Sequence, residues 1–341
     1  MNLRQQKVVL ILEKEEDAYP HKVSKIRMEE THISWIFLTG LYAYKIKKQL
    51  KFGKILDFST LKLRKKFCQK EVVLNKFLCG DMYQGVVKIV KENGKNGNNM
   101  RIVNQEENGR VLEYAVKMLE IPQKYRMDNL LASGKVTLKT IESLTKTLVK
   151  FHRCTPTNAK IKNFGYPEFM EKKIHENFDT LAKLKTVDPK FENTLILFVK
   201  KNKKLFYQRI REDKIRDIHG DLYLKNIFIL ENNKFYLYDR IEFNDDLRYA
   251  DIAEDMAHLS MDLDYHKRSD LRKHLISQYI AKSSDINLEN LVYFLMCYKA
   301  CIRSKVSLFH AKNETIAKKR MAHIRESKDL LKLAESYLES F

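Results

Sequence analysis

The sequence predicts an α+β protein in two parts, an antiparallel sheet with one long helix followed by a mainly helical region. Strand-like segments with alternating apolar residues lie mainly in the first 119 residues. Helical periodicity dominates the remainder. The 341 residues, 44% of them hydrophobic and 11% aromatic, can form one large or two ordinary domains. We place the boundary after Pro122, which gives the parts 1–122 and 123–341.

The N-terminal part is expected to contain two helices and six strands. The first helix runs from Leu3 to about Asp17. The second runs from Thr60 to about Leu78, with Ser59 as its N-cap. Residues 93–99, rich in Asn and Gly, are expected to form a mobile hairpin loop. The expected strands are 23–30, 34–38, 41–47, 85–90, 101–103 and 112–119.

The C-terminal part is expected to consist of helices. Residues 138–153 carry apolar side chains on one face, and a helical region covers about 167–216. A further helix opens at Arg248, and three more follow from about Lys267. Within these, residues 291–308 are apolar enough to lie in a core.

Hydropathy and cysteine usage indicate a cytoplasmic protein. No apolar run approaches the roughly 20 residues that span a bilayer, and the run Val8–Leu12 is too short for a signal-peptide core. The five cysteines show no Cys-x-x-Cys spacing, and Cys297 and Cys301 lie in an apolar run typical of a buried helix. We therefore expect reduced cysteines and no membrane contact.

The formal net charge of +20 is the main argument for a nucleic-acid partner. Much of this charge is dispersed along the chain. The densest tract, residues 200–211, has Leu205, Phe206 and Ile210 at helical spacing, which is typical of the solvated face of an amphipathic helix. We therefore do not expect nucleic-acid binding as the main function.

Three oxygen-bearing side chains mark the candidate site: Asp221, Asn226 and Asp239. Two apolar runs between them predict a strand-turn-strand segment, which could bring all three to one edge. Phosphoryl transfer needs an oriented acceptor hydroxyl and Mg²⁺ on the polyphosphate. Asp221 can orient the hydroxyl and take its proton, while an amide oxygen and a carboxylate suit Mg²⁺. The alternative is a β-hairpin with an ordinary polar turn.

The spacing of these residues matches the catalytic-loop Asp, catalytic-loop Asn and metal-binding Asp of the protein-kinase signature. With His219 and Gly220 in front, the stretch resembles the aminoglycoside phosphotransferase (APH)-like branch of the kinase superfamily. The resemblance implies a two-lobed, protein-kinase-like α+β fold that uses ATP and Mg²⁺. It also covers the segments 18–21, 30–35, 44–48, 56–60, 215–222 and 241–245.

The resemblance implies that residues 1–122 form a nucleotide-binding N-lobe. Lys45, in the third strand, would bind phosphates and pair with Glu71 of the following helix. Alone, these two residues would be an ordinary surface lysine and glutamate. No Gly-x-Gly-x-x-Gly joins the first strands, so the hydroxyls of Thr31 and Ser34 are the expected phosphate contacts. The hinge that binds adenine would include Met118 and Glu120.

The same resemblance implies that residues 123–341 form the C-lobe, with the catalytic loop and the acceptor side. His219 would position the loop, and Asp251 or Asp255, four apart on one predicted helix, would brace it. Capping and salt bridging are alternative roles for both aspartates. Glu242 and Arg248 are the expected acceptor contacts. Arg240 follows the metal Asp where a small or uncharged residue is expected, so its guanidinium could neutralise phosphate or substrate.

The sequence thus favours an ATP- and Mg²⁺-dependent phosphotransferase that acts on a hydroxyl of a small molecule. A protein hydroxyl is an alternative acceptor. The alternative from a different class is a non-catalytic kinase-like module that binds an acidic partner or RNA. Many proteins of this kind carry a fused P-loop kinase domain. This sequence has no P-loop motif, so a separate P-loop kinase is an expected partner.

Overall fold

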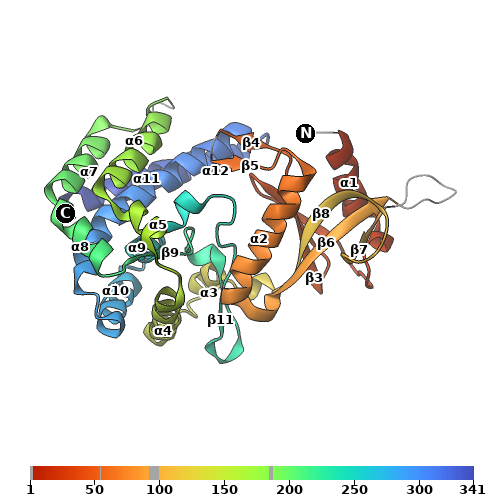
Figure 1. Cartoon of the computed structure of the whole chain (residues 1–341), viewed down its shortest axis with the longest axis horizontal. Coiled ribbons are helices and arrows are strands. Elements are labelled where there is room, and N and C mark those ends of the chain that lie inside the picture. The colour runs from red at the N-terminus through yellow and green to blue at the C-terminus, as the bar shows by residue number, and fades with distance from the viewer. Residues whose placement is uncertain (1–2, 54, 92–99, 184–186) are drawn as a thin grey trace. The chain divides into compact units, whose positions relative to one another are not determined.

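The computed structural model describes residues 3–53, 55–91, 100–183 and 187–341. The chain divides into two compact units (Figure 1). Unit 1 comprises Met1–Tyr125 and Tyr236–Asp245, and unit 2 comprises Arg126–Phe235 and Asp246–Phe341. The chain therefore returns to unit 1 for one short segment, which contains Asp239. The hairpin loop expected at 93–99 lies outside the described residues.

Unit 1 is built on a six-stranded antiparallel sheet in the order β1-β2-β3-β8-β6-β7. Each of the six expected strands is present, so this part of the prediction is confirmed. A small separate sheet pairs β4 (Lys51–Phe52) with β5 (Leu56–Asp57). The strands of the main sheet are β1 Arg27–Glu30, β2 Ser34–Leu38, β3 Tyr42–Lys47, β6 Tyr83–Lys91, β7 Met100–Val103 and β8 Arg110–Leu119.

Helices cover the sheet of unit 1. Helix α1 (Leu3–Lys14) contacts β2 and β8, and α2 (Leu61–Cys79) contacts β6 and β8 (Figure 1). Side chains alternate between the two faces of a strand. In β3, Tyr44 and Ile46 therefore enter the hydrophobic core that includes Val8 and Leu12 of α1. The intervening Lys45 and Lys47 reach a glutamate of α2 instead.

The start of α2 differs from the prediction by one residue. Thr60 is the N-cap, since its hydroxyl accepts a hydrogen bond from the Leu63 N–H at 3.2 Å. The Ser59 hydroxyl donates to Asp57 at 2.6 Å instead. Ser and Thr are both preferred N-cap residues, so the choice between neighbours depends on where the chain turns.

Unit 2 is mainly helical, as predicted. Figure 1 shows α11 beside α9 and α12, with which it packs. Cys297 and Cys301 of α11 are fully buried, which confirms them as core thiols. The helices are α3 Met127–Ala132, α4 Leu138–Cys154, α5 Ala159–Lys162, α6 Pro167–Lys183, α7 Pro189–Lys201, α8 Lys203–Arg211, α9 Ala253–Tyr265, α10 Ser269–Ser283, α11 Glu289–Asn313 and α12 Ala317–Tyr337.

Short strands frame the segment that contains Asp221. β9 (Ile215–Asp217) pairs in antiparallel fashion with β12 (Tyr249–Asp251). β10 (Ile227–Ile229) and β11 (Phe235–Leu237) are the two strands that the apolar runs predicted. The helix expected to open at Arg248 begins only at Ala253, because the intervening residues pair with β9 instead.

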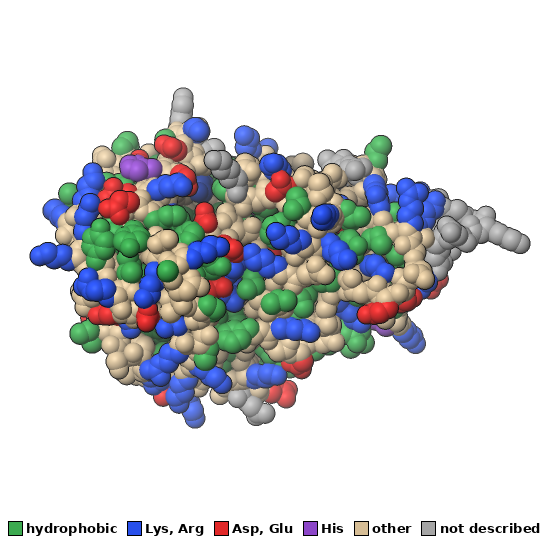
Figure 2. Space-filling view, in the orientation of Figure 1, with side chains coloured by type: hydrophobic (Ala, Val, Ile, Leu, Met, Phe, Trp, Pro, Cys, Tyr) green, Lys and Arg blue, Asp and Glu red, His purple; other side chains and the backbone are tan. Residues whose placement is uncertain are grey.

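The basic tract 200–211 covers the end of α7 and the whole of α8, which meet at Asn202. All four of its lysines are exposed, as predicted, but Arg209 is fully buried. Across the visible face, Lys and Arg side chains lie scattered between acidic and apolar ones (Figure 2). No helix in the described part of the chain is long and apolar enough to cross a membrane.

Candidate active site

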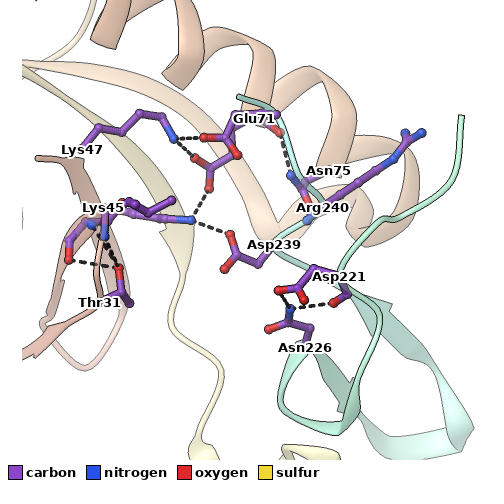
Figure 3. A network of polar contacts seen from close by, with 12 residues as sticks. Thr31, Lys45, Lys47, Glu71, Asn75, Asp221, Asn226, Asp239 and Arg240 are labelled. Carbon is purple, nitrogen blue, oxygen red and sulfur yellow. Dashed lines mark hydrogen bonds and ion pairs between the residues drawn. The ribbon is translucent and has the colours of Figure 1, made fainter. Parts of the chain in front are cut away.

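Lys45 lies near the middle of the candidate site in unit 1. Its side chain is 6% exposed, and its ammonium donates to Glu71 at 2.9 Å and to Asp239 (Figure 3). Burial alone would lower the pKa of Lys45, but Asp239 and Glu71 raise it well above its usual value. The lysine therefore carries a positive charge inside the protein. The ion pair expected between Lys45 and Glu71 is present.

Lys47 is a second buried lysine on the same face of β3. Its ammonium donates to the other oxygen of Glu71 at 2.6 Å and to Glu242. Burial opposes ionisation of Glu71, yet Lys45 and Lys47 lower its pKa to about 2. Burial raises the pKa of Glu242, although Lys47 acts against this shift. One glutamate of α2 thus joins two lysines of β3.

Glu242 is buried, although a residue that contacts an acceptor is expected to be accessible. The side chain is 3% exposed, and its carboxylate accepts from Lys47 inside unit 1. An ion pair buried to this degree is costly to open, because it would leave an unpaired charge inside the protein. Glu242 therefore ties the segment 236–245 to β3.

Gln5 and Glu113 anchor the end of β3 at Lys47. The Gln5 amide donates to the Lys47 carbonyl at 3.0 Å and to Glu113 at 2.7 Å. Arg64 of α2 donates to the same carboxylate at 3.0 Å. Side chains from α1, α2 and β8 therefore fix the end of β3.

Asp239 is held by its backbone while its carboxylate stays 40% exposed. The residue has a left-handed backbone with φ of 62°, which Asp tolerates better than most residues. Its N–H donates to the Tyr83 hydroxyl at 3.2 Å. The next N–H, of Arg240, donates to Asn75, which in turn donates to the Glu71 carbonyl (Figure 3). The helix that carries Glu71 therefore also fixes Asp239.

Thr31 and Ser34, the expected phosphate contacts, are occupied within their own turn. The Thr31 hydroxyl accepts from the N–H groups of Ile33 and Ser34 at 3.3 and 3.0 Å. The Ser34 side chain is fully buried at the start of β2. The turn is ordered by Thr31, and the Ser34 hydroxyl is directed into the protein.

Met118 and Glu120, the expected hinge residues, lie at the end of β8. Met118 is buried between Ala43 and Tyr83 in the sheet register. The Glu120 N–H donates to the Leu41 carbonyl at 3.0 Å, which extends the pairing of β3 with β8. Its carboxylate accepts from the Gly40 N–H at 2.7 Å and pairs with Arg27 at 2.6 Å. The N–H of Glu120 is therefore already used within unit 1.

In unit 2, Asn226 and Asp221 lie against each other. The Asn226 amide nitrogen donates to the Asp221 carbonyl at 2.9 Å and to its carboxylate at 3.2 Å (Figure 3). Using the nitrogen in this way leaves the amide oxygen of Asn226 for a cation. The Asp221 side chain is 40% exposed, so its carboxylate is accessible from solvent. An amide oxygen is a ligand that Mg²⁺ accepts.

Asp255 of α9 braces the loop before Asp221. Its carboxylate accepts from the N–H groups of His219 and Gly220 at 2.8 and 3.0 Å. Burial opposes its charge, but hydrogen bonding with His152 lowers the pKa of Asp255. His219 is fully buried, and its Nδ1 accepts from the Asp221 N–H at 3.3 Å.

Asp251 and Arg248 have other roles. The Asp251 carboxylate accepts from the N–H of Ala253, the first residue of α9, at 2.8 Å, and it pairs with the buried Arg209 at 2.6 Å. Asp251 and Asp255 therefore do not share a helix face, because Asp251 ends β12. The Arg248 side chain is 2% exposed and forms an ion pair with Asp217. Arg248 is therefore not placed to meet an acceptor in solution.

The sequence interpretation missed Lys47, His258 and Asp262. Lys47 follows Lys45 by two residues, which is the strand spacing for one face. His258 and Asp262 follow Asp255 by three and seven residues, which is the helix spacing for one face. The Asp262 carboxylate accepts from the Leu224 N–H at 2.9 Å.

Within the described ranges, His, Cys, Asp and Glu nowhere gather in a group of three that could hold a metal.

Solved phosphotransferases have the same fold. The choline kinase of Cryptosporidium parvum matches with a TM-score of 0.53 and 10% identity, over 97% of this chain and 94% of the kinase. A GDP complex of aminoglycoside 2'-phosphotransferase-IIIa matches with a TM-score of 0.53 and 15% identity, over 98% of this chain and 97% of that enzyme. The chain has the protein-kinase-like fold of these enzymes. Plasmodium vivax ethanolamine kinase matches with a TM-score of 0.50 and 14% identity, over 91% of this chain and 82% of the kinase. The resemblance inferred from the sequence is confirmed at the level of the fold.

The sequence relatives are proteins whose function is not characterised. Those of Mycobacterium bovis and Mycobacterium tuberculosis are 29% identical over 290 residues, which is 82% of this chain and 54% of theirs. The chain therefore spans about half the length of the curated relatives it matches. No family model matches the sequence.

Proposed function

We propose that the chain transfers the γ-phosphoryl group of ATP, with Mg²⁺, to a hydroxyl of a small molecule. The observation that carries this proposal is the buried Lys45, which is paired at once with Glu71 of α2 and with the half-exposed Asp239. A lysine held straight by a helix glutamate, beside a carboxylate that can bind metal, is the phosphate-binding arrangement of kinases.

The residues of unit 1 would hold the nucleotide. Lys45 remains charged despite its burial and would bind phosphate oxygens in place of Asp239. Asp239 would then be free to bind a cation, and we propose it with Asn226 of unit 2 as the protein ligands of Mg²⁺. When bound, Mg²⁺ neutralises the charge that develops on the transferred group. Residues 1–122 are accordingly proposed as the nucleotide-binding part.

Asp221 would act as the base. Its accessible carboxylate can accept the proton of an acceptor hydroxyl, while the amide of Asn226 fixes its orientation. Asp255 holds the two backbone groups that precede it. Residues 123–341 are proposed as the part that presents this loop and the acceptor.

The acceptor class is supported by the fold relatives, which are a choline kinase, an ethanolamine kinase and an aminoglycoside phosphotransferase. All of these names imply a small molecule with a hydroxyl group. Five free cysteines fit the proposed cytoplasmic location. We also propose a P-loop kinase as a partner, which the sequence resemblance supports and which co-purification would test.

The test is ATP turnover by the purified chain over a library of small hydroxyl compounds, with Mg-ATP binding measured in parallel. Asp221→Asn should lower turnover about 10²- to 10⁴-fold, the usual contribution of a general base. Mg-ATP binding should persist. Asp179→Asn, at an exposed carboxylate of α6, is the matched control. Unchanged turnover in Asp221→Asn would refute the base. Mg-ATP binding without turnover on any acceptor would favour the non-catalytic module.

A further inference from the structure

One face of α9 reaches the loop around Asp221 at three successive points. Asp255, His258 and Asp262 follow one another at intervals of three and four residues, so they share that face. Asp255 and Asp262 each accept hydrogen bonds from backbone N–H groups of the loop. His258 lies between them, with its Nδ1 at 3.8 Å from a carboxylate oxygen of Asp221.

The His258 imidazole is buried without hydrogen bonds. It is 4% exposed, and neither ring nitrogen has a hydrogen-bond partner in the part of the chain that the structure describes. The ring stacks on Tyr223 with centroids 5.5 Å apart and planes 11° apart. Buried polar groups without partners are uncommon and costly, so such a group calls for an explanation.

The surroundings of His258 keep it neutral. Burial lowers the pKa of His258 well below its usual value, and the positive charges of Lys299 and Arg303 act in the same direction, as does His219. Asp221 is the carboxylate that faces the ring. A neutral imidazole has one N–H donor and one acceptor nitrogen, so it can give one hydrogen bond to a carboxylate without adding charge.

We propose that His258 is a positioning residue, which donates its Nδ1–H to Asp221 when nucleotide and acceptor are bound. The observed 3.8 Å is too long for a hydrogen bond. Hydrogen bonds of catalytic groups are often long in substrate-free structures and shorten in the reactive complex. Stacking on Tyr223 restrains the orientation of the ring. The inference rests on the proposed function in so far as Asp221 is the base.

Three variants separate the hydrogen bond from simple packing. His258→Asn places an amide nitrogen near the position of Nδ1, His258→Gln places one near Nε2, and His258→Phe keeps only the ring. With an acceptor found, kcat should fall about 10- to 100-fold in the Gln and Phe variants, the rate equivalent of one hydrogen bond to a charged group. The Asn variant should recover most of the loss, and KM for ATP should not change. His266→Phe, exposed at the end of α9, is the control.

Two outcomes would overturn the inference while leaving the proposed function intact. One is wild-type kcat in His258→Phe. The other is an equal loss in all three variants together with a lowered melting temperature, which would indicate a structural histidine only. An inactive wild type would refute the proposed function instead.

Nitrogen NMR of the histidine-labelled full chain tests His258 without any turnover. With the non-hydrolysable analogue AMP-PNP, Mg²⁺ and a hydroxyl compound bound, the proposal expects the proton on Nδ1. Asp221→Asn should shift that nitrogen resonance under the same conditions, while the exposed His266 stays unchanged. A proton on Nε2, or a resonance indifferent to Asp221→Asn, would overturn the inference.

Discussion

Among the described residues, each unit has a buried glutamate that lies between two lysines. The distances from carboxylate to ammonium are similar, 2.9 and 2.6 Å in unit 1 and 2.7 Å twice in unit 2. In each case the two lysines lower the pKa of the glutamate to about 2 against the effect of burial. The clusters are Glu71 with Lys45 and Lys47 in unit 1, and Glu254 with Lys173 and Lys299 in unit 2.

The two clusters differ in what surrounds them. In unit 1, Asp239 pairs with one lysine and Glu242 with the other, which makes three carboxylates for two ammonium groups. In unit 2, Glu254 is the only carboxylate among the described residues that forms an ion pair with either lysine. Of the three carboxylates in the unit 1 cluster, Asp239 is the accessible one, since its side chain is 40% exposed. A buried Lys–Glu–Lys cluster therefore does not by itself indicate a site, and our proposal for unit 1 depends on the accessible carboxylate of Asp239.

The largest expected effect is on folding of unit 2. Glu254→Gln would leave the partly buried Lys173 and the buried Lys299 without a carboxylate, so we expect a loss of about 3–5 kcal/mol in the free energy of unfolding. Urea denaturation of the full chain, followed by far-UV circular dichroism, measures this loss. The signal is dominated by helices, most of which belong to unit 2.

Glu71→Gln is the matched comparison in unit 1. Each lysine keeps a carboxylate, Asp239 or Glu242, so we expect a smaller loss of about 1–3 kcal/mol. Fluorescence of Trp35, the single tryptophan and a residue of the unit 1 core, follows this unit separately. Equal losses of unfolding free energy in the two variants would contradict the view that Asp239 and Glu242 compensate for Glu71 in unit 1.

The next largest expected effect is on Mg-ATP binding by way of Asp239. Asp239→Asn should weaken Mg-ATP binding by at least about 100-fold, since changes to residues that only support metal ligands already cost 10- to 100-fold. Nucleotide binding in EDTA should change much less. Titration calorimetry of both variants measures this difference, with Asp245→Asn as control in the same segment, where Asp245 pairs with Lys70 at the surface. Equal loss with and without Mg²⁺ would rule out Asp239 as a metal ligand.

Much of unit 1 could be predicted because its signals are local. Two-residue alternation in β3 places Tyr44 and Ile46 on one face and the lysines on the other. The contact of Lys45 with Glu71 was expected from the resemblance and is present. Its role in phosphate binding remains a prediction.

The remaining contacts depend on long-range packing that sequence spacing does not encode. Glu242 and Arg248 look like accessible charges in the sequence, but each is buried against an ion partner from a distant segment. Asp251 fell within a helical pattern, yet pairing with β9 keeps it in a strand. His258 was detectable by its helical spacing from Asp255, although nothing in the sequence indicates that its nitrogens lack partners.

The smallest expected effect is a difference in acid sensitivity between the units. The pKa of Glu254 is lowered from 4.5 to about 2, so its stabilisation is complete above about pH 4.5 and is lost as the pH falls toward 2. The shift corresponds to about 3 kcal/mol. In unit 1 the loss from Glu71 is partly offset, because the raised pKa of Glu242 favours the folded state on protonation. Acid titration should therefore reduce the helical signal at a higher pH than the Trp35 signal, and Glu254→Gln should weaken the acid dependence of the helical signal. Coincident midpoints in the wild type would contradict the difference between the two clusters.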